Sequence, residues 1–227
     1  MPHTETTVSR RRVLLGTAAL ALLGGAVSAC GKAAERDPAL DILTAELDRA
    51  RSDSQLAAAA ATKAAGDAGV ITELASPLDG TLVALADVPD PVFSKGTMGP
   101  GVAVQPSGDT AYSPGNGTVI AAQPTGHAFG LVLDGGIEVL IHVGIDTVQL
   151  KGEGFTVHVN KGDKVTTGSP LVTFDRKIIE DAGYSLVTPV IVLNGKKFAS
   201  VEPAAAGSVA VGDPILTIQT KAAPANV

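Results

Sequence analysis

From Ile71 onward the chain alternates short aliphatic runs with clusters of Gly, Pro, Asn and Asp. This pattern is typical of short strands separated by turns. It predicts an all-β fold class over residues 71–221, an antiparallel β-sandwich or barrel-like domain, followed by a short tail at residues 222–227.

One predicted hairpin is centred on Asp134-Gly135. Asp-Gly favours a two-residue type I′ turn, because both central positions of that turn need a positive φ. Such a turn pairs His127 with His142, and directly opposed side chains have Cβ atoms roughly 4.5–5.5 Å apart. The opposite face would then carry small and β-branched residues suited to burial: Ala128, Gly130, Val132, Ile137, Val139 and Ile141. A shift of one residue would place the two imidazoles on opposite faces.

Two pairs of short segments repeat within the β region. Ser76–Val83 is echoed by Ser113–Ile120, and Val165–Leu171 is echoed by Val209–Ile215. Each echo occurs only twice, whereas a solenoid needs at least three stacked repeats. We therefore expect a β-sandwich made of two related halves.

Residues 31–70 are rich in Ala and charge and predict one amphipathic helix followed by a linker. Asp37-Pro38 fits an N-cap and first helical position, and Gly66 ends the run. Apolar residues recur at helical spacing at Leu40, Leu43, Leu47 and Ala50. The helix could be a spacer between a membrane and the β domain, or it could pack on another chain.

Residues 1–30 predict a targeting or anchoring segment. Ser9–Leu15 resembles a twin-arginine export motif, and an apolar run follows from Val13 to Ala29. The segment Val27-Ser28-Ala29-Cys30 is similar to a bacterial lipoprotein cleavage box, with Cys30 as the acylated residue. The apolar run is marginal for a spanning helix, which needs about 20 residues. An uncleaved anchor is the alternative.

Composition narrows the function classes. The 227 residues include 26 Gly, 14 Pro and only 3% aromatics, which fits a turn-rich β protein with a core of small aliphatic side chains. The net charge of −6 and the lack of a basic stripe with interleaved aromatics argue against a nucleic-acid partner. Cys30 is the only cysteine, which excludes an intramolecular disulfide and a cysteine-based metal cage.

Two of the four histidines would meet across the hairpin. Paired imidazoles suit acid–base chemistry, metal binding or phosphoryl transfer, and the pairing alone leaves these open. Asp146 follows His142 by one short loop, so its carboxylate could fold back to an imidazole and fix the tautomer, or it could serve as an Asx-turn residue. His158 alternates with Val157 and Val159 and predicts a solvent-facing position.

From about Leu74 to Lys221 the chain resembles the glucose-type enzyme IIA domain of the bacterial phosphoenolpyruvate-dependent sugar phosphotransferase system. Three separated segments carry the resemblance in the right order: Asp87–Phe93, Thr125–Phe129 and Leu140–Phe155. The chain departs from the family pattern at Tyr112–Gly117 and has aliphatic residues at Leu140 and Val143, where aromatic rim residues are more usual.

The resemblance implies a phosphotransferase component with a phosphohistidine intermediate. His142 would accept a phosphoryl group on Nε2 from the phosphocarrier protein HPr and pass it to a cysteine of a sugar-permease IIB domain. His127 would donate an N–H to the phosphoryl oxygens, Thr125 would orient His127, and Asp146 would be the acid near the site. No cofactor would be required, although His127 and His142 could bind a transient zinc ion together with a partner carboxylate.

The resemblance also implies an exposed apolar rim for partner binding, formed by Val92, Phe93, Phe129, Leu140, Val143 and Val148. Each of these residues could instead belong to the core. Regulatory target proteins are further possible partners, and the membrane would be contacted through the N-terminus. Because HPr and phosphoenolpyruvate are cytoplasmic, the domain is expected at the inner face of the cell membrane.

Two other functions stay open at the level of sequence. An exported lipoprotein anchored through Cys30 could keep the fold as a binding or regulatory module without phosphotransfer. A LytM-like zinc hydrolase would also suit a lipoprotein leader. That class needs a His-x-His pair, and the corresponding candidate segment here is His158-Val159-Asn160, which disfavours it.

Overall fold

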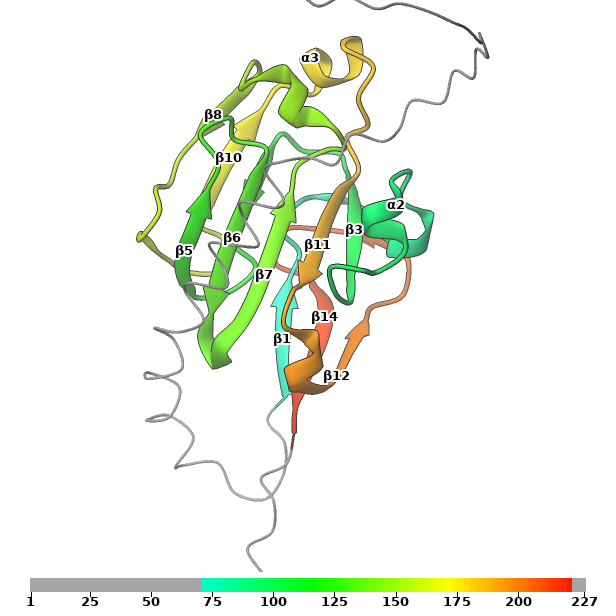
Figure 1. The fold of residues 1–227 in the computed structure, drawn as a ribbon, viewed down its shortest axis with the longest axis vertical. Coiled ribbons are helices and arrows are strands. Elements are labelled where there is room, and N and C mark those ends of the chain that lie inside the picture. Colours follow the sequence, from blue (N-terminus) through cyan, green and yellow to red (C-terminus); the bar gives the residue numbers. More distant parts are fainter. Residues whose placement is uncertain (1–70, 222–227) are drawn as a thin grey trace, which may run out of the picture. The chain divides into compact units, whose positions relative to one another are not determined.

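The computed structural model describes residues 71–221, which form a domain built mainly of antiparallel strands (Figure 1). The prediction of an all-β domain is confirmed. The strands are β1 (Ile71–Ala75), β2 (Gly80–Ala84), β3 (Gly101–Pro106), β4 (Thr110–Tyr112), β5 (Gly117–Ala122), β6 (Ala128–Leu133), β7 (Ile137–His142), β8 (Phe155–Val157), β9 (Lys164–Val165), β10 (Pro170–Phe174), β11 (Thr188–Val192), β12 (Phe198–Pro203), β13 (Gly207–Val209) and β14 (Pro214–Thr220). The short helices are α2 (Pro91–Ser94) and α3 (Arg176–Asp181), and the 3₁₀ turns are η2 (Leu85–Asp87), η3 (Asp134–Gly136), η4 (Thr147–Leu150) and η5 (Gly195–Lys197).

The strands form one large and two small sheets. The large sheet has eight strands in the order β13-β2-β3-β11-β7-β6-β5-β9, and the small sheets have the orders β1-β14-β12 and β4-β10-β8. Figure 1 shows β5, β6, β7, β11 and β3 side by side, with α2 next to β3. Strand β7 therefore lies inside the large sheet, where both of its edges are paired.

The large sheet buries apolar side chains on both faces. On one face Leu131 and Val139 join the main core, which also contains Leu216 of β14 and Phe174 of β10. On the other face Leu140 and Ala128 join a smaller core, which α2 covers with Phe93. All six residues of β7 are buried. A strand buried on both faces reads as a continuous hydrophobic run, and this burial fixes the end of β7 where His142 lies.

The hairpin between β6 and β7 differs from its predicted register. The loop contains three residues, Asp134–Gly136, and the positive φ angles fall on Gly135 (+77°) and Gly136 (+70°). His142 consequently pairs with Ala128, and the predicted pairing of His127 with His142 is wrong. The cause lies in the turn: Gly135-Gly136 meets the demand for positive φ more easily than Asp134-Gly135, since glycine has no Cβ.

The two-halves prediction is supported by equivalent pairing in both repeats. Strand β2 pairs with β13 through Gly80 and Val209, and β5 pairs with β9 through Gly117 and Val165. The echoed segments also make the same backbone contact: the Ser76 N–H donates to the Asp213 carbonyl, and the Ser113 N–H donates to the Ser169 carbonyl. The short sequence echoes thus mark structurally equivalent strands.

Several predictions fall outside residues 71–221. These are the leader with Cys30, the amphipathic helix and linker of residues 31–70, and the tail of residues 222–227. The division into these segments stays a prediction. Within the described range, no helix has the length and apolar character that crossing a bilayer requires.

Candidate functional site

The site is organised around His142, the last residue of β7, whose side chain is only 1% exposed. Its Nδ1 lies 2.7 Å from the carbonyl oxygen of Gly144. A carbonyl oxygen can only accept a hydrogen bond, so Nδ1 must carry the proton. In a neutral imidazole this leaves the lone pair on Nε2. The local backbone therefore selects the tautomer in which Nε2 of a neutral His142 carries the lone pair.

The loop after His142 is shaped by Gly144, which has a φ of +73°. A Cβ at this position would lie 2.7 Å from the backbone oxygen of Ser185, closer than real Cβ atoms approach. The next residue, Ile145, donates its N–H to that same Ser185 oxygen at 2.9 Å. Glycine is thus required both by the backbone conformation and by the close approach of the neighbouring segment.

His127 precedes β6 and follows a turn in which the Gly126 N–H donates to the Gln123 carbonyl. The His127 carbonyl accepts from the Val143 N–H at 2.7 Å, which extends the β6–β7 ladder by one pair. Because His127 lies outside regular strand geometry, strict alternation of side chains no longer applies to it. Its ring approaches that of His142 with centroids 5.3 Å apart and planes at 69°. The predicted proximity of the two imidazoles is therefore present, although the register that suggested it is not.

Thr125 holds the His127 ring. Its Oγ1 lies 2.7 Å from Nδ1 of His127. A hydroxyl can donate to or accept from an imidazole nitrogen. When Thr125 donates, the His127 proton is on Nε2, the atom that could then donate to an anion held near both rings.

Phe93 closes one side of the site from α2. Asp90 caps this helix by accepting from the N–H groups of Val92 (2.8 Å) and Phe93 (3.1 Å), and Pro91 follows at the first helical position. The cap holds the Phe93 ring 5.4 Å from the His142 ring, at 56°. Phe93 is 3% exposed, so in this conformation it packs on the imidazole as a buried wall.

The predicted role of Asp146 as the group that fixes an imidazole tautomer is not supported. Its side chain is exposed, its φ is +59°, and the Nδ1 of His142 is bonded to Gly144 instead. Asp146 precedes η4, and its backbone carbonyl accepts from the Gln149 N–H. Its side chain makes no cap hydrogen bond to η4, so the alternative of an Asx-turn residue is not supported either. Asp and Asn tolerate this left-handed backbone better than most residues.

The predicted apolar rim divides into core and surface residues. Phe129, Leu140 and Val143 are 0% exposed and Phe93 is 3% exposed. All four belong to the two cores, so their assignment to an exposed rim is wrong. Val92 and Val148 are half-buried. A residue flanked by other apolar residues on a fully buried strand gives no sign of which face it occupies, which is why the family position alone misplaced these side chains.

Metal ligands are sparse around the two histidines. Within residues 71–221 no group of three or more His, Cys, Asp or Glu side chains is placed to hold a metal ion. Two imidazoles alone leave a tetrahedral zinc site incomplete. His158, the histidine of the hydrolase alternative, bonds through Nε2 to Thr173 Oγ1 at 2.8 Å and is exposed.

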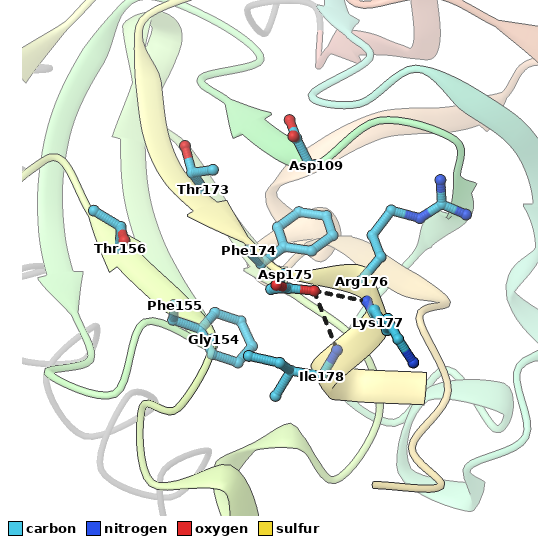
Figure 2. A pocket seen from close by; sticks show the side chains of 10 residues that line it. All are labelled: Asp109, Gly154, Phe155, Thr156, Thr173, Phe174, Asp175, Arg176, Lys177 and Ile178. Atoms are coloured by element: carbon cyan, nitrogen blue, oxygen red, sulfur yellow. Dashed lines mark hydrogen bonds between the residues drawn. The ribbon is translucent and has the colours of Figure 1, made fainter. Parts of the chain in front are cut away.

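A separate hollow lies beside α3 and the strands β8 and β10 (Figure 2). Its charged lining is mixed and contains Asp109, Asp175, Arg176 and Lys177. Figure 2 shows Asp175 accepting from the Lys177 and Ile178 N–H groups, and Arg176 donates to the Ser107 carbonyl. These groups cap and anchor α3. None of the described site residues predicted from the sequence lines this hollow.

Comparison with known proteins identifies relatives of the described domain. Residues 72–198 match the family model described as phosphoenolpyruvate-dependent sugar phosphotransferase system, EIIA 1. The mannose-specific EIIBCA component of the phosphotransferase system of Corynebacterium glutamicum is 50% identical over 135 residues, which cover 60% of this chain and 20% of that protein. The chain thus spans about a fifth of the length of this multidomain relative.

Two single-domain proteins are covered more fully. The glucose-specific EIIA component of Halalkalibacterium halodurans is 45% identical over 138 residues, which cover 61% of this chain and 80% of that protein. The solved structure of glucose permease IIA from Mycoplasma capricolum matches with a TM-score of 0.62 and 34% identity, over 65% of this chain and 96% of the other.

Proposed function

Because the chain belongs to the EIIA 1 family of the phosphoenolpyruvate-dependent sugar phosphotransferase system, we propose that it is a phosphoryl carrier in which Nε2 of His142 is the acceptor. The observation that carries this proposal is the bond from His142 Nδ1 to the Gly144 carbonyl, which leaves Nε2 unprotonated. The donor is the phosphohistidine of an HPr-type phosphocarrier protein, and the final acceptor is a cysteine of a IIB-type domain.

The chemistry requires no cofactor. The Nε2 lone pair of His142 forms a bond to phosphorus while the donor's N–P bond breaks, and that electron pair returns to the donor imidazole. The proton on Nδ1 stays in place, so positive charge develops on the His142 ring. The Gly144 carbonyl dipole points at that charge and stabilises it. In the second step the ring leaves as a neutral imidazole, which makes the phosphoryl group easy to pass on.

His127 and Thr125 assist this transfer in our proposal. The imidazole of His127 is close enough to His142 to contact a phosphoryl group on it, since the ring centroids are 5.3 Å apart. We assign the donor role to Thr125 Oγ1, which lies 2.7 Å from His127 Nδ1. The proton of His127 is then on Nε2, the atom that would donate to a phosphoryl oxygen. Positioned donors of this kind are the main demand of phosphoryl transfer, because charge spreads over the oxygens without further covalent change. Asp146, exposed at the edge of this loop, would contribute negative charge at the docking surface rather than orient a ring.

The partner surface is the sheet face that α2 partly covers. Half-buried apolar side chains surround the smaller core on this face: Val83, Leu85, Val92, Met98, Ile120, Val187 and Leu193. An apolar patch with a polar margin is typical of a protein docking site. Val92 and Val148 are the members of the predicted rim that retain exposure.

We place the domain on the cytoplasmic side of the membrane, where phosphoenolpyruvate and HPr are found, with the N-terminal segment on the membrane. The curated relatives include mannose-, glucose- and β-glucoside-specific components. Sugar choice belongs to the permease domains, so this chain alone does not define it. Protease treatment of intact and lysed cells tests the location: the domain should resist digestion until the cytoplasmic membrane is broken, and digestion in osmotically shocked cells would support export through Cys30.

Phosphoryl uptake tests the function. The full chain is incubated with phosphoenolpyruvate, enzyme I and HPr, and intact mass and acid lability are measured. One acid-labile phosphoryl group per chain, absent without HPr, is the expected result. No uptake under conditions that label a known IIA domain would favour a binding or regulatory module instead.

A further inference from the structure

Thr188 is a buried residue at the start of β11, and the sequence gives no motif that singles it out. Its side chain is 0% exposed. The hydroxyl accepts from the Gly144 N–H at 3.3 Å and donates to the Leu186 carbonyl at 2.9 Å. Gly144 is also the residue whose carbonyl holds Nδ1 of His142. Thr188 is thus one hydrogen bond away from the residue that selects the tautomer.

The contact exists because the ladder between β7 and β11 ends here. Regular pairing reaches Ile141 and Val190, and Gly144 then turns the chain away with a positive φ. Its N–H would be buried without a strand partner, which is costly for a backbone donor. The Thr188 hydroxyl takes the place of the missing strand partner.

The segment before β11 also holds the peptide group between Gly144 and Ile145. The Ile145 N–H donates to the Ser185 carbonyl at 2.9 Å, and this N–H belongs to the peptide whose carbonyl faces His142. The amides on both sides of Gly144 are therefore anchored to the segment that leads into β11. Of these two anchors, Thr188 is the one made by a side chain and can be changed without altering the backbone.

We propose that Thr188 is a positioning residue for the phosphoryl-accepting histidine: its hydroxyl fixes the Gly144 backbone so that the Gly144 carbonyl keeps the proton of His142 on Nδ1. This inference rests on the proposed function for its catalytic meaning. Thr188 does not touch the phosphoryl group in this arrangement. Its loss lets the loop shift, lengthens the bond to Nδ1 and allows the other tautomer, in which Nε2 is protonated and cannot attack phosphorus.

The test compares three variants of the full chain. Thr188→Val keeps the branched shape and removes the hydroxyl, whereas Thr188→Ser keeps the hydroxyl and removes the methyl group. Thr173→Val is the matched control, because Thr173 also makes hydroxyl hydrogen bonds but lies on β10 in another sheet. The ring nitrogens of His142 are observed by ¹⁵N NMR and assigned with His142→Gln, and the rate and KM of phosphoryl uptake from HPr are measured.

We expect a single Nδ1–H tautomer of His142 in the wild type, in Thr188→Ser and in Thr173→Val. Thr188→Val should show a mixed tautomer and a maximal uptake rate lower by about tenfold, with a KM for HPr within about twofold of the wild type, since docking is unchanged. Wild-type tautomer and rate in Thr188→Val would overturn the proposal. If Thr188→Val does not fold, Thr188→Ser decides: loss of the Nδ1–H tautomer there would mean that the methyl group and not the hydroxyl matters.

The NMR measurement needs no phosphoryl donor. A wild-type chain that takes up no phosphoryl group but shows the tautomer change in Thr188→Val would contradict the proposed function and support the positioning role. If the wild-type chain takes up phosphoryl groups and Thr188→Val changes neither the tautomer nor the rate, the proposed function is supported and the positioning role is contradicted. The two claims therefore fail separately.

Discussion

The Nδ1 atom of His142 lies 2.7 Å from the carbonyl oxygen of Gly144, the residue two positions further along the chain. This short-range bond directs the lone pair of a neutral imidazole to Nε2, the atom that we propose as the phosphoryl acceptor. A positive φ at Gly144 makes the bond possible, because the backbone folds back toward the ring it has just passed.

The two histidines should fail at different steps. His142→Gln removes the acceptor atom and should abolish phosphoryl uptake. His127→Gln keeps the acceptor but removes an imidazole donor, so it should still be labelled by HPr while onward transfer to a IIB domain falls by about 10²-fold, the size of effect seen when one oxyanion donor is lost. Single-turnover assays of each step measure this, and equal loss at both steps in His127→Gln would count against its assigned role.

Alanine at position 144 should destabilise the fold. Its Cβ would meet the Ser185 oxygen at 2.7 Å and would also require a φ near +73°. Backbone strain and overpacking together should lower the free energy of unfolding by about 3 kcal/mol, measured by urea denaturation.

Gly136→Ala is the matched control, since Gly136 has a similar φ of +70° but a Cβ there meets nothing within 4 Å. It should cost only about 1 kcal/mol, the penalty for positive φ alone. Equal losses in the two variants would show that the close approach at Gly144 carries no energetic weight.

Loss of either of two aspartate helix caps should destabilise the fold equally, but only one of them should affect phosphoryl uptake. Asp90 caps α2 and Asp175 caps α3, each by accepting two backbone N–H groups. Replacement of either by Ala should lower the free energy of unfolding by about 1 kcal/mol. Only Asp90→Ala should slow phosphoryl uptake, by several-fold, because α2 holds Phe93 beside His142. Uptake unchanged in Asp90→Ala would mean that the Phe93 wall does not affect the site.

Substitutions at surface members of the predicted rim should weaken HPr binding, whereas substitutions at its buried members should lower stability. Val148 is half-buried and Leu140 is fully buried. Val148→Asp should raise the KM for HPr by about tenfold while the free energy of unfolding changes by less than about 1 kcal/mol. Leu140→Ala should instead cost about 2–5 kcal/mol of stability through the cavity it leaves. If Leu140→Ala is as stable as the wild type but binds HPr more weakly, Leu140 is part of the docking surface and the core assignment is wrong.

The fold class was predictable because its signals are local, whereas the two histidines were brought together in the prediction by a hairpin register that the structure does not contain. Alternating aliphatic runs and turn residues indicate strands, and the echoed segments at Ser76 and Ser113 correspond to strands with equivalent partners. The register was not predictable in the same way. A two-residue turn at Asp134-Gly135 and a three-residue loop at Asp134–Gly136 both suit this sequence, and the longer loop shifts every residue of β6 by one position relative to β7.

Of the two threonines that contact the histidines or their loop, one was predictable from the sequence and the other was not. Thr125 was found because it lies two residues from His127 within a recognisable segment. Thr188 was missed because it is distant in the sequence from His142 and approaches Gly144 only when β11 pairs with β7. The rim was misplaced at Leu140 and Val143 because a strand buried on both faces shows no alternation that separates core from surface.

The most direct test of the central claim identifies the atom that carries the phosphoryl group. The ¹⁵N-labelled full chain is phosphorylated through HPr, and the ring nitrogens of His142 are observed by NMR with detection of coupling to ³¹P. The phosphorus should be bonded to Nε2 of His142 while Nδ1 keeps its proton. A phosphoryl group on Nδ1, on another residue, or none at all while a known IIA domain is labelled under the same conditions would contradict it.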